Sequence, residues 1–390
     1  MNRDPLRLAA RAEAIEPFRV MDVLARARAL EAAGADVIHM EVGEPDFPTP
    51  RPIVEAGRRA LAEGRTGYTP ALGIPELREA IARHYRERHG LAVAPQRIVV
   101  TPGASGALLL VLAALLGRDE TVALADPGYP CNRHFARAVE GRAVALPGAA
   151  EHGYQPTAAA LAALDPPPRL VLVASPANPT GTLIAPAELA AIHAWCRRTG
   201  AALVVDEIYH GLVYEGEAPT ALALGEDVLV INSFSKYFGM TGWRLGWLVA
   251  PEGLVRALER LAQNLFIAAP TPAQHAALAA FTPATLEIAE ERRAAFRARR
   301  EFLVPALRGL GFSVPVTPQG AFYVYADSRA FDDDCERLCR RLLEEAHVAV
   351  TPGTDFGRHE ARGHVRFAYT TGIDRLERAV ERIRRLLAQG

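Results

Sequence analysis

Short apolar runs alternate with helical patterns through the middle of the chain. The runs, rich in Val, Leu and Ile, cover residues 97–101, 121–125, 142–146, 170–175, 201–206, 228–233 and 244–250. Segments with helical spacing lie between them, among others at 104–116, 131–139 and 186–199. Strands that are apolar throughout and joined by helices are typical of a mostly parallel sheet covered on both faces. The pattern predicts an α/β fold whose mostly parallel sheet contains these seven runs.

The pattern changes after about residue 283. A charged helical segment, 284–307, is followed by strand-like segments at 312–316 and 321–325, a helix at 332–346, a strand-like segment at 365–369 and a final helix to 387. This predicts a smaller α+β domain. The N-terminal helix, 20–33, has no strand partner nearby, so we expect it to join this domain or a neighbouring subunit. The predicted domains are a large one, 45–284, and a small one made of 1–44 with 285–390.

Charge and composition exclude several classes of protein. The 44 basic and 45 acidic residues give a net charge of −1, so no basic surplus points to nucleic acid or an anionic membrane. The most apolar run, 107–116, is too short to span a bilayer, and the N-terminus lacks a signal-peptide core. Four cysteines are too few for a disulfide scaffold, and neither they nor the histidines have metal-ligand spacing. We expect a cytoplasmic protein without metal, membrane or nucleic-acid partners.

One feature of the basic residues is unusual. Lys236 is the only lysine, and the other 43 of the 44 basic residues are arginine. A guanidinium stays protonated, whereas a lysine amine can lose its proton and form a Schiff base. Either this lysine is present by chance or its position requires an amine. The residues around it distinguish the two possibilities.

Polar and small residues follow several predicted strands, at the edge where parallel sheets bind ligands. The first strand leads into 101–106, Thr-Pro-Gly-Ala-Ser-Gly, a turn whose N–H groups can meet a phosphate. Tyr129 follows the second strand and Asn178 the fourth. Asp206 ends the fifth strand, where a buried carboxylate is costly unless it pairs with a cation, and Lys236 follows the sixth. Taken singly, each could be an ordinary turn, core aromatic or internal salt bridge.

An amine, an aromatic side chain, a buried carboxylate and a phosphate turn together describe a pocket for pyridoxal phosphate. Residues 233–246, with Ser-Phe-Ser-Lys and the later Gly-Trp-Arg-Leu-Gly, resemble the lysine signature of class I, aspartate aminotransferase-like enzymes. Segments 41–47, 67–70 and 320–324 stand in the order that this family shows. The resemblance implies the fold type I architecture. It also implies an aminotransferase that moves an amino group from an L-amino acid to a 2-oxo acid by a ping-pong mechanism.

The resemblance implies roles around the cofactor ring. Lys236 would form the Schiff base and move the proton at the substrate α-carbon. Asp206 would keep the ring nitrogen protonated, Tyr209 and Asn178 would bond the ring hydroxyl, and Tyr129 would stack on the ring.

It also implies the residues that bind charged groups. The expected phosphate contacts are Gly103, Ala104, Ser105, Ser233, Ser235 and Arg244. Gly43, Asn178 and Arg366 would hold the substrate α-carboxylate, and Tyr68 would reach the phosphate of the neighbouring subunit in a homodimer.

The substrate side chain is less well defined. Ser105 stands where some bacterial aspartate-specific relatives carry a lysine for the distal carboxylate, which argues against aspartate without excluding it. Phe18, His39 and Asn132 are candidates for the side-chain pocket. A C–S β-lyase or related lyase of the same fold is the alternative activity. A regulator of this fold would carry an added DNA-binding segment, which we do not expect here.

Overall fold

The computed structural model describes residues 8–389. Its central sheet has seven strands in the order β2-β8-β7-β6-β5-β3-β4. They are β2 (Ile98–Thr101), β3 (Thr121–Asp126), β4 (Arg142–Pro147), β5 (Leu170–Ala174), β6 (Ala202–Asp206), β7 (Leu229–Ser233) and β8 (Gly246–Val249). β8 runs antiparallel to both its neighbours and the other pairs are parallel. The predicted mostly parallel seven-stranded sheet is confirmed.

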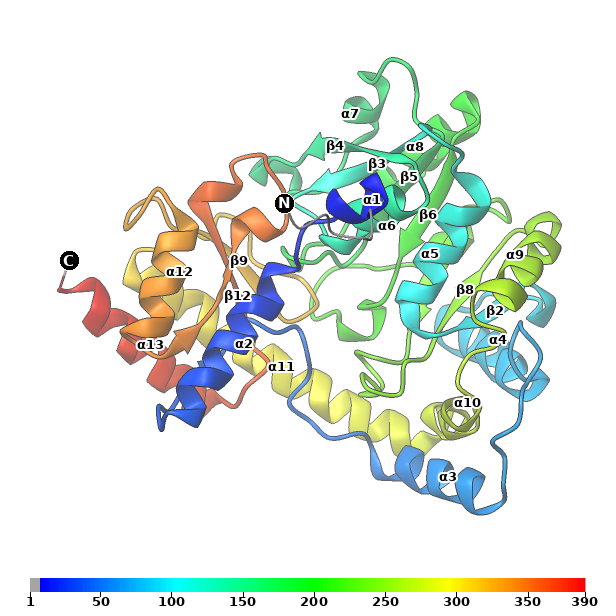
Figure 1. Cartoon of the computed structure of the whole chain (residues 1–390), viewed down its shortest axis with the longest axis horizontal. Coiled ribbons are helices and arrows are strands. Elements are labelled where there is room, and N and C mark those ends of the chain that lie inside the picture. Colours follow the sequence, from blue (N-terminus) through cyan, green and yellow to red (C-terminus); the bar gives the residue numbers. More distant parts are fainter. Residues whose placement is uncertain (1–7, 390) are drawn as a thin grey trace, which may run out of the picture.

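Helices cover both faces of this sheet (Figure 1). They include α4 (Pro75–His89), α5 (Gly103–Leu115), α6 (Cys131–Ala138), α7 (Ala158–Ala162), α8 (Pro186–Thr199) and α9 (Glu252–Leu265). Val204 of β6 packs in the cluster that contains residues of α5 and α9, whereas Leu203 and Val205 pack in the cluster on the other face. Successive strand side chains point to opposite faces, which is why these strands are apolar at consecutive positions.

A smaller α+β part is built around β11-β12-β9, a three-stranded antiparallel sheet. Its strands are β9 (Tyr323–Asp327), β11 (Thr351–Pro352) and β12 (His364–Ala368), and a parallel pair, β1 (Ile38–His39) with β10 (Val348–Ala349), lies alongside. Its helices are α12 (Cys335–Glu344) and α13 (Ile373–Leu387). This part is what the fold class predicted.

One long helix, α11 (Pro283–Leu310), spans the two parts, and short helices lie in the connections. α11 runs from α3 (Arg51–Ala62), beside α10 (Thr271–Ala277), to α13 (Figure 1). The short helices are α1 (Ala10–Glu13), η1 (Pro95–Arg97), η2 (Ala150–His152), η3 (His210–Leu212), η4 (Ala221–Leu224), η5 (Leu278–Phe281), η6 (Gly353–Asp355) and η7 (Ala361–Gly363).

The N-terminal helix α2 (Arg19–Ala32) packs on the α+β part of its own chain. Its buried Ala27 lies in one cluster with Val37, Leu343 of α12 and Ala349 of β10. We expected this helix to join either the smaller domain or a neighbouring subunit, and the structure shows it on the smaller part of its own chain.

One predicted strand is wrong. Residues 312–316 form no strand, and only Ser313 bridges to Asp327. Pro315 interrupts the segment, and a proline has no N–H to donate to a strand ladder. No helix within residues 8–389 combines the length and apolar character needed to cross a membrane.

Candidate active site

A cavity of about 360 Å³ lies at the carboxyl ends of the parallel strands, between the large sheet and the three-stranded sheet. Of the residues expected to bind the cofactor or the substrate α-carboxylate, all except two line it: Gly43, Ala104, Ser105, Tyr129, Asn178, Asp206, Tyr209, Ser233, Ser235, Lys236, Arg244 and Arg366. Gly103 lies directly beside Arg244 without lining the cavity. Tyr68 is elsewhere on the surface of this chain, with 87% of its area exposed.

Lys236 follows β7 and brings its amine into the cavity. Its Nζ donates a hydrogen bond to the Gly43 carbonyl oxygen at 2.6 Å. Burial lowers the pKa of this amine to about 8, although the nearby Glu44 carboxylate opposes the shift. A lysine with this pKa carries a substantial neutral fraction near pH 8, and the neutral amine is the form that acts as nucleophile or base.

Asp206 ends β6 with its side chain buried. Its Oδ1 accepts a hydrogen bond from the Ile208 N–H at 3.0 Å. Burial raises the pKa of the carboxyl to about 6, while the Ile208 N–H and the charge of Lys236 favour the ionised form. Within residues 8–389 it has no salt-bridge partner, so it can pair with a cationic ring nitrogen brought by a ligand.

A cradle for an anion forms where β2 meets α5. Gly103 starts α5 with a φ of +70°, and a Cβ there would lie 2.5 Å from Arg244 Nη2. Glycine therefore allows the guanidinium to approach the positive end of the helix. The hydroxyls of Ser233 and Ser235, 3.0 Å apart, lie on the same cavity. Guanidinium, hydroxyls and helix N-terminus together suit a phosphate.

Arg366 of β12 is a buried cation whose N–H groups are only partly paired. Its Nη1 donates to Asn178 Oδ1 at 2.8 Å, and its Nη2 donates to the Glu41 carbonyl oxygen. The guanidinium carbon lies 4.3 Å from the centre of the Tyr323 ring. Its buried Nε has no hydrogen-bond partner among the described residues. A guanidinium held this firmly with a spare N–H suits a substrate carboxylate.

Three tyrosines complete the walls. The hydroxyl of Tyr209 lies 2.9 Å from that of Tyr323. Tyr129 meets Phe18 edge to face, with ring centres 6.3 Å apart. Burial raises the pKa of all three phenols, which keeps them protonated as hydrogen-bond donors.

Several lining residues had no predicted role. Tyr323 stood within the 320–324 motif, and Val20 and Met21 form part of the first turn of α2. The sequence around Met21 does not mark it as a site residue, because only tertiary packing determines what the first turn of α2 faces. Of the three pocket candidates, Phe18 lines the cavity, whereas Asn132 lines a neighbouring one of about 390 Å³.

The third candidate, His39, lies outside both cavities. Its Nδ1 is 2.7 Å from Glu41 Oε1 and its Nε2 is 3.1 Å from Glu31 Oε1.

The donor set fits pyridoxal phosphate. Lys236 offers an amine for its aldehyde, and buried Asp206 offers an unpaired carboxylate for its ring nitrogen. The Arg244 guanidinium, the hydroxyls of Ser233 and Ser235 and the N-terminus of α5 offer donors for its phosphate.

Comparison with known proteins gives the family. Residues 35–383 match the family described as aminotransferase class I and II. The chain is 43% identical to a valine–pyruvate aminotransferase of Mycobacterium tuberculosis over 97% of both chains. It is 39% identical to an aspartate/prephenate aminotransferase of Thermus thermophilus, over 98% of this chain and 99% of that one.

Solved structures agree with this assignment. A crystal structure of an aminotransferase from Mycobacterium tuberculosis superimposes with a TM-score of 0.96 at 42% identity, covering 99% of this chain and 100% of that one. The aspartate aminotransferase of Thermus thermophilus with maleate gives a TM-score of 0.93 at 38% identity, covering 98% and 100%. The chain therefore belongs to the class I and II aminotransferase family and is an aminotransferase that uses pyridoxal phosphate.

Proposed function

We propose that the chain moves an amino group from an L-amino acid to a 2-oxo acid by a ping-pong mechanism in which Lys236 is the catalytic residue. In such a scheme the first product, a 2-oxo acid, leaves before the second substrate binds. The observation that carries the proposal is the position of the single lysine. Its amine shares one cavity with a buried carboxylate, Asp206, and a buried guanidinium, Arg366.

Bound pyridoxal phosphate supplies an aldehyde that condenses with amines and a ring that accepts the electrons left when the α-proton departs. Lys236 Nζ would hold the cofactor and, once released by the substrate amine, would move the proton at the substrate α-carbon. Asp206 would keep the ring nitrogen protonated, while Tyr209 and Asn178 would orient the ring hydroxyl. Tyr129 would cover one face of the ring.

The charged ends of cofactor and substrate would bind at opposite sides of the cavity. Backbone N–H groups of 103–105, the hydroxyls of Ser233 and Ser235, and Arg244 would hold the phosphate. The free Nε of Arg366 would donate to the substrate α-carboxylate, with Asn178 and the backbone of Gly43 beside it. With these assignments, the α-amino and α-carboxylate groups of every substrate would bind in the same way. The substrate side chain would contact the rest of the cavity wall.

We also propose two domains, 45–284 and 1–44 with 285–390, and a homodimer in which Tyr68 reaches the neighbouring phosphate. The exposed hydroxyphenyl of Tyr68 and the half-exposed Leu265 and Ile267 support a contact with a second copy. The proposed location is cytoplasmic, and all four cysteines are free.

The test uses the cofactor-loaded protein and single amino acids. Transamination predicts loss of the cofactor's aldehyde-form absorbance together with an equal amount of the matching 2-oxo acid. Lys236→Arg should bind the substrate carboxylate but form no 2-oxo acid. Accumulation of pyruvate and ammonia with repeated turnover would instead show the lyase activity and overturn the proposal.

A further inference from the structure

We propose that His39 and Glu41 are positioning residues for the substrate α-carboxylate, because together they hold the backbone carbonyl group that bonds Arg366. This inference rests on the proposed function, since it concerns the carboxylate that Arg366 would bind. It goes further in giving a role to two residues that line neither cavity.

The Glu41 carbonyl oxygen accepts hydrogen bonds from two side chains. Arg366 Nη2 donates to it, and Thr351 Oγ1 donates to it at 3.0 Å. The same Arg366 nitrogen also donates to Thr351 Oγ1 at 3.2 Å, so the three groups contact one another. One edge of the guanidinium is therefore held by a backbone atom, and its direction depends on where that atom lies.

The backbone on either side of Glu41 is bonded to the end of β12. The Met40 carbonyl oxygen accepts a hydrogen bond from the Ala368 N–H at 2.7 Å. The Val42 carbonyl oxygen accepts one from Thr370 Oγ1 at 3.3 Å. These bonds hold the two neighbours of Glu41, and the side chain of Glu41 is placed to hold the residue between them.

The Glu41 carboxylate is a fully buried group with a single partner. Its Oε1 lies 2.7 Å from His39 Nδ1, and its Oε2 has no hydrogen-bond partner among the described residues. A buried carboxylate without a partner costs free energy. Loss of the His39 ring would therefore favour a shift of Glu41 toward water, and the carbonyl group that Arg366 uses would shift with it.

His39 has the charge that this contact needs. Its Nε2 lies 3.1 Å from Glu31 Oε1 on α2. Ionised carboxylates only accept hydrogen bonds, so a ring that bonds two of them carries a proton on both nitrogens. The hydrogen bond to Glu41 raises the pKa of His39, against the opposing effect of burial. The imidazolium thus connects α2 to the backbone that bonds Arg366.

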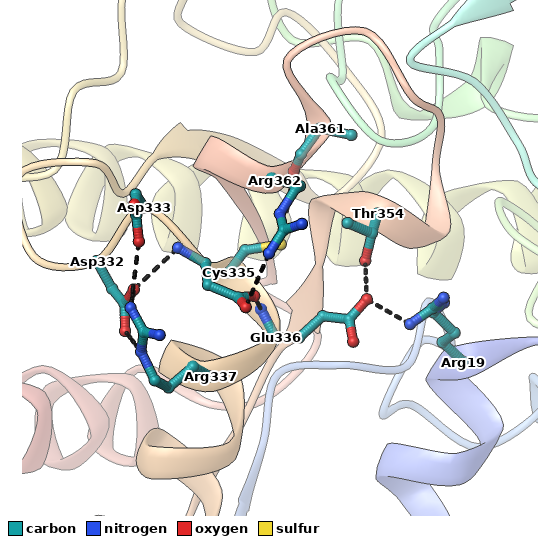
Figure 2. Close-up of polar contacts among 10 residues, drawn as sticks. Arg19, Asp332, Asp333, Cys335, Glu336, Arg337, Thr354, Ala361 and Arg362 are labelled. Carbon is teal, nitrogen blue, oxygen red and sulfur yellow. Dashed lines mark hydrogen bonds and ion pairs between the residues drawn. The ribbon is translucent and has the colours of Figure 1, made fainter.

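α2 is itself anchored to the α+β part. Arg19 at its start forms an ion pair with Glu336 of α12 (Figure 2). Farther along α2, Arg26 bonds both carboxylate oxygens of Glu344 at 2.6 and 2.7 Å. Its Glu31 is therefore presented to the imidazolium by a helix that is fixed at two points.

The first experiment measures carboxylate binding apart from turnover. The probe 2-aminoisobutyrate has the amine and α-carboxylate of an amino acid but no α-proton, and tert-butylamine has a methyl group in place of that carboxylate. Absorbance titration of the cofactor-loaded protein gives the dissociation constant of each. His39→Leu should raise that of 2-aminoisobutyrate at least about ten-fold and leave that of tert-butylamine unchanged. Arg366→Lys, the reference for a lost carboxylate contact, should show the same pattern.

Kinetics give a second readout. With the amino acid that reacts best, His39→Leu should raise KM at least about ten-fold and change kcat by less than about three-fold. An equal loss in kcat would show a general structural effect and would overturn the assignment.

Two further variants separate the two ring nitrogens, and they remain informative if His39→Leu fails to fold. The amide N–H of His39→Asn lies near the position of Nδ1, toward Glu41, whereas His39→Gln extends toward Glu31. We expect His39→Asn to bind 2-aminoisobutyrate within about three-fold of the unmodified protein, and His39→Gln to bind it at least about ten-fold more weakly.

His193→Leu is the matched control. It removes a buried histidine that pairs with Asp227 at 3.1 Å and lines neither cavity. The dissociation constants of both probes should stay unchanged in this variant. A loss of 2-aminoisobutyrate binding equal to that in His39→Leu would mean that any missing histidine pair has this effect, and would overturn the inference.

The outcomes separate this inference from the proposed function. If Arg366→Lys weakens the binding of 2-aminoisobutyrate and His39→Leu does not, or if His39→Gln binds it better than His39→Asn, the inference is overturned while transamination stands. Failure of every amino acid to yield its 2-oxo acid overturns the proposed function. The titrations need no turnover, so they still test the two positioning residues in that case.

Discussion

Arg366 of the three-stranded sheet donates a 2.8 Å hydrogen bond to Asn178, which follows β5 of the seven-stranded sheet. The bond joins the two parts of the molecule at the wall of the candidate active site. It also fixes the orientation of both groups that would meet the substrate α-carboxylate. If a substrate carboxylate binds at Arg366, its binding would be linked to the approach of the two parts.

The first prediction concerns this guanidinium. Arg366→Lys should lower kcat/KM by about 100-fold for every amino acid tested, because an ammonium cannot make the same set of directed hydrogen bonds. Most of the loss should be in KM. Arg362→Lys is the matched control, since Arg362 is exposed and pairs with Asp334 outside the cavity. A loss confined to one substrate would contradict a role at the common α-carboxylate.

The second prediction concerns the anion cradle. Gly103→Ala should raise the dissociation constant for pyridoxal phosphate at least about ten-fold, because the new Cβ would displace the guanidinium of Arg244. Gly64→Ala is the control, since Gly64 has the same φ of +70° but no atom within 4 Å of the added Cβ. Both variants carry the backbone penalty of about 1 kcal/mol. Equal cofactor affinity in the two would exclude the proposed cradle.

The third prediction is a pH dependence. The pKa of Lys236, lowered by burial to about 8, makes the neutral amine more abundant as pH rises through that value. The rate at which the cofactor-free protein takes up pyridoxal phosphate should rise about ten-fold per pH unit below pH 8 and then level off. Absorbance during mixing measures this rate.

A variant identifies the group that titrates. The Glu44 carboxylate favours the ammonium form, so Glu44→Gln should move the midpoint to lower pH. Glu55→Gln removes an exposed carboxylate that pairs with Arg58, outside the cavity, and should leave the midpoint in place. If the midpoint does not shift in Glu44→Gln, a group other than Lys236 controls the rate of cofactor uptake.

The fourth prediction tests the second subunit. Tyr68 is 87% exposed in the single chain, so Tyr68→Phe should leave its stability unchanged. If its hydroxyl meets a neighbouring phosphate, its loss should weaken cofactor binding about ten-fold or more. Sedimentation should show a dimer in both proteins. A monomer, or unchanged cofactor affinity, would remove Tyr68 from the site.

The local pattern of apolar and polar positions was enough to predict the large sheet and the edge of it where the candidate site residues lie. Strands such as β6 are apolar at consecutive positions because both faces are covered, and this property is visible in a short stretch of sequence. Residues that follow parallel strands meet at one edge, so Lys236 and Asp206 could be expected in one cavity from their order alone. Lys236 could be singled out because it is the only lysine among 44 basic residues.

The tertiary structure decided what comes together from distant parts of the chain. Arg366 could not be distinguished by residue type among 43 arginines, and its partners Asn178 and Glu41 lie 188 and 325 residues away. The apolar turn of α2 reaches the cavity only because α2 packs on the α+β part. Hydrophobic periodicity reports which face of a helix is buried but not what it is buried against. For that reason the sequence alone determined the sheet, the family resemblance and the candidate lysine, and the packing of remote segments determined which other residues line the cavity.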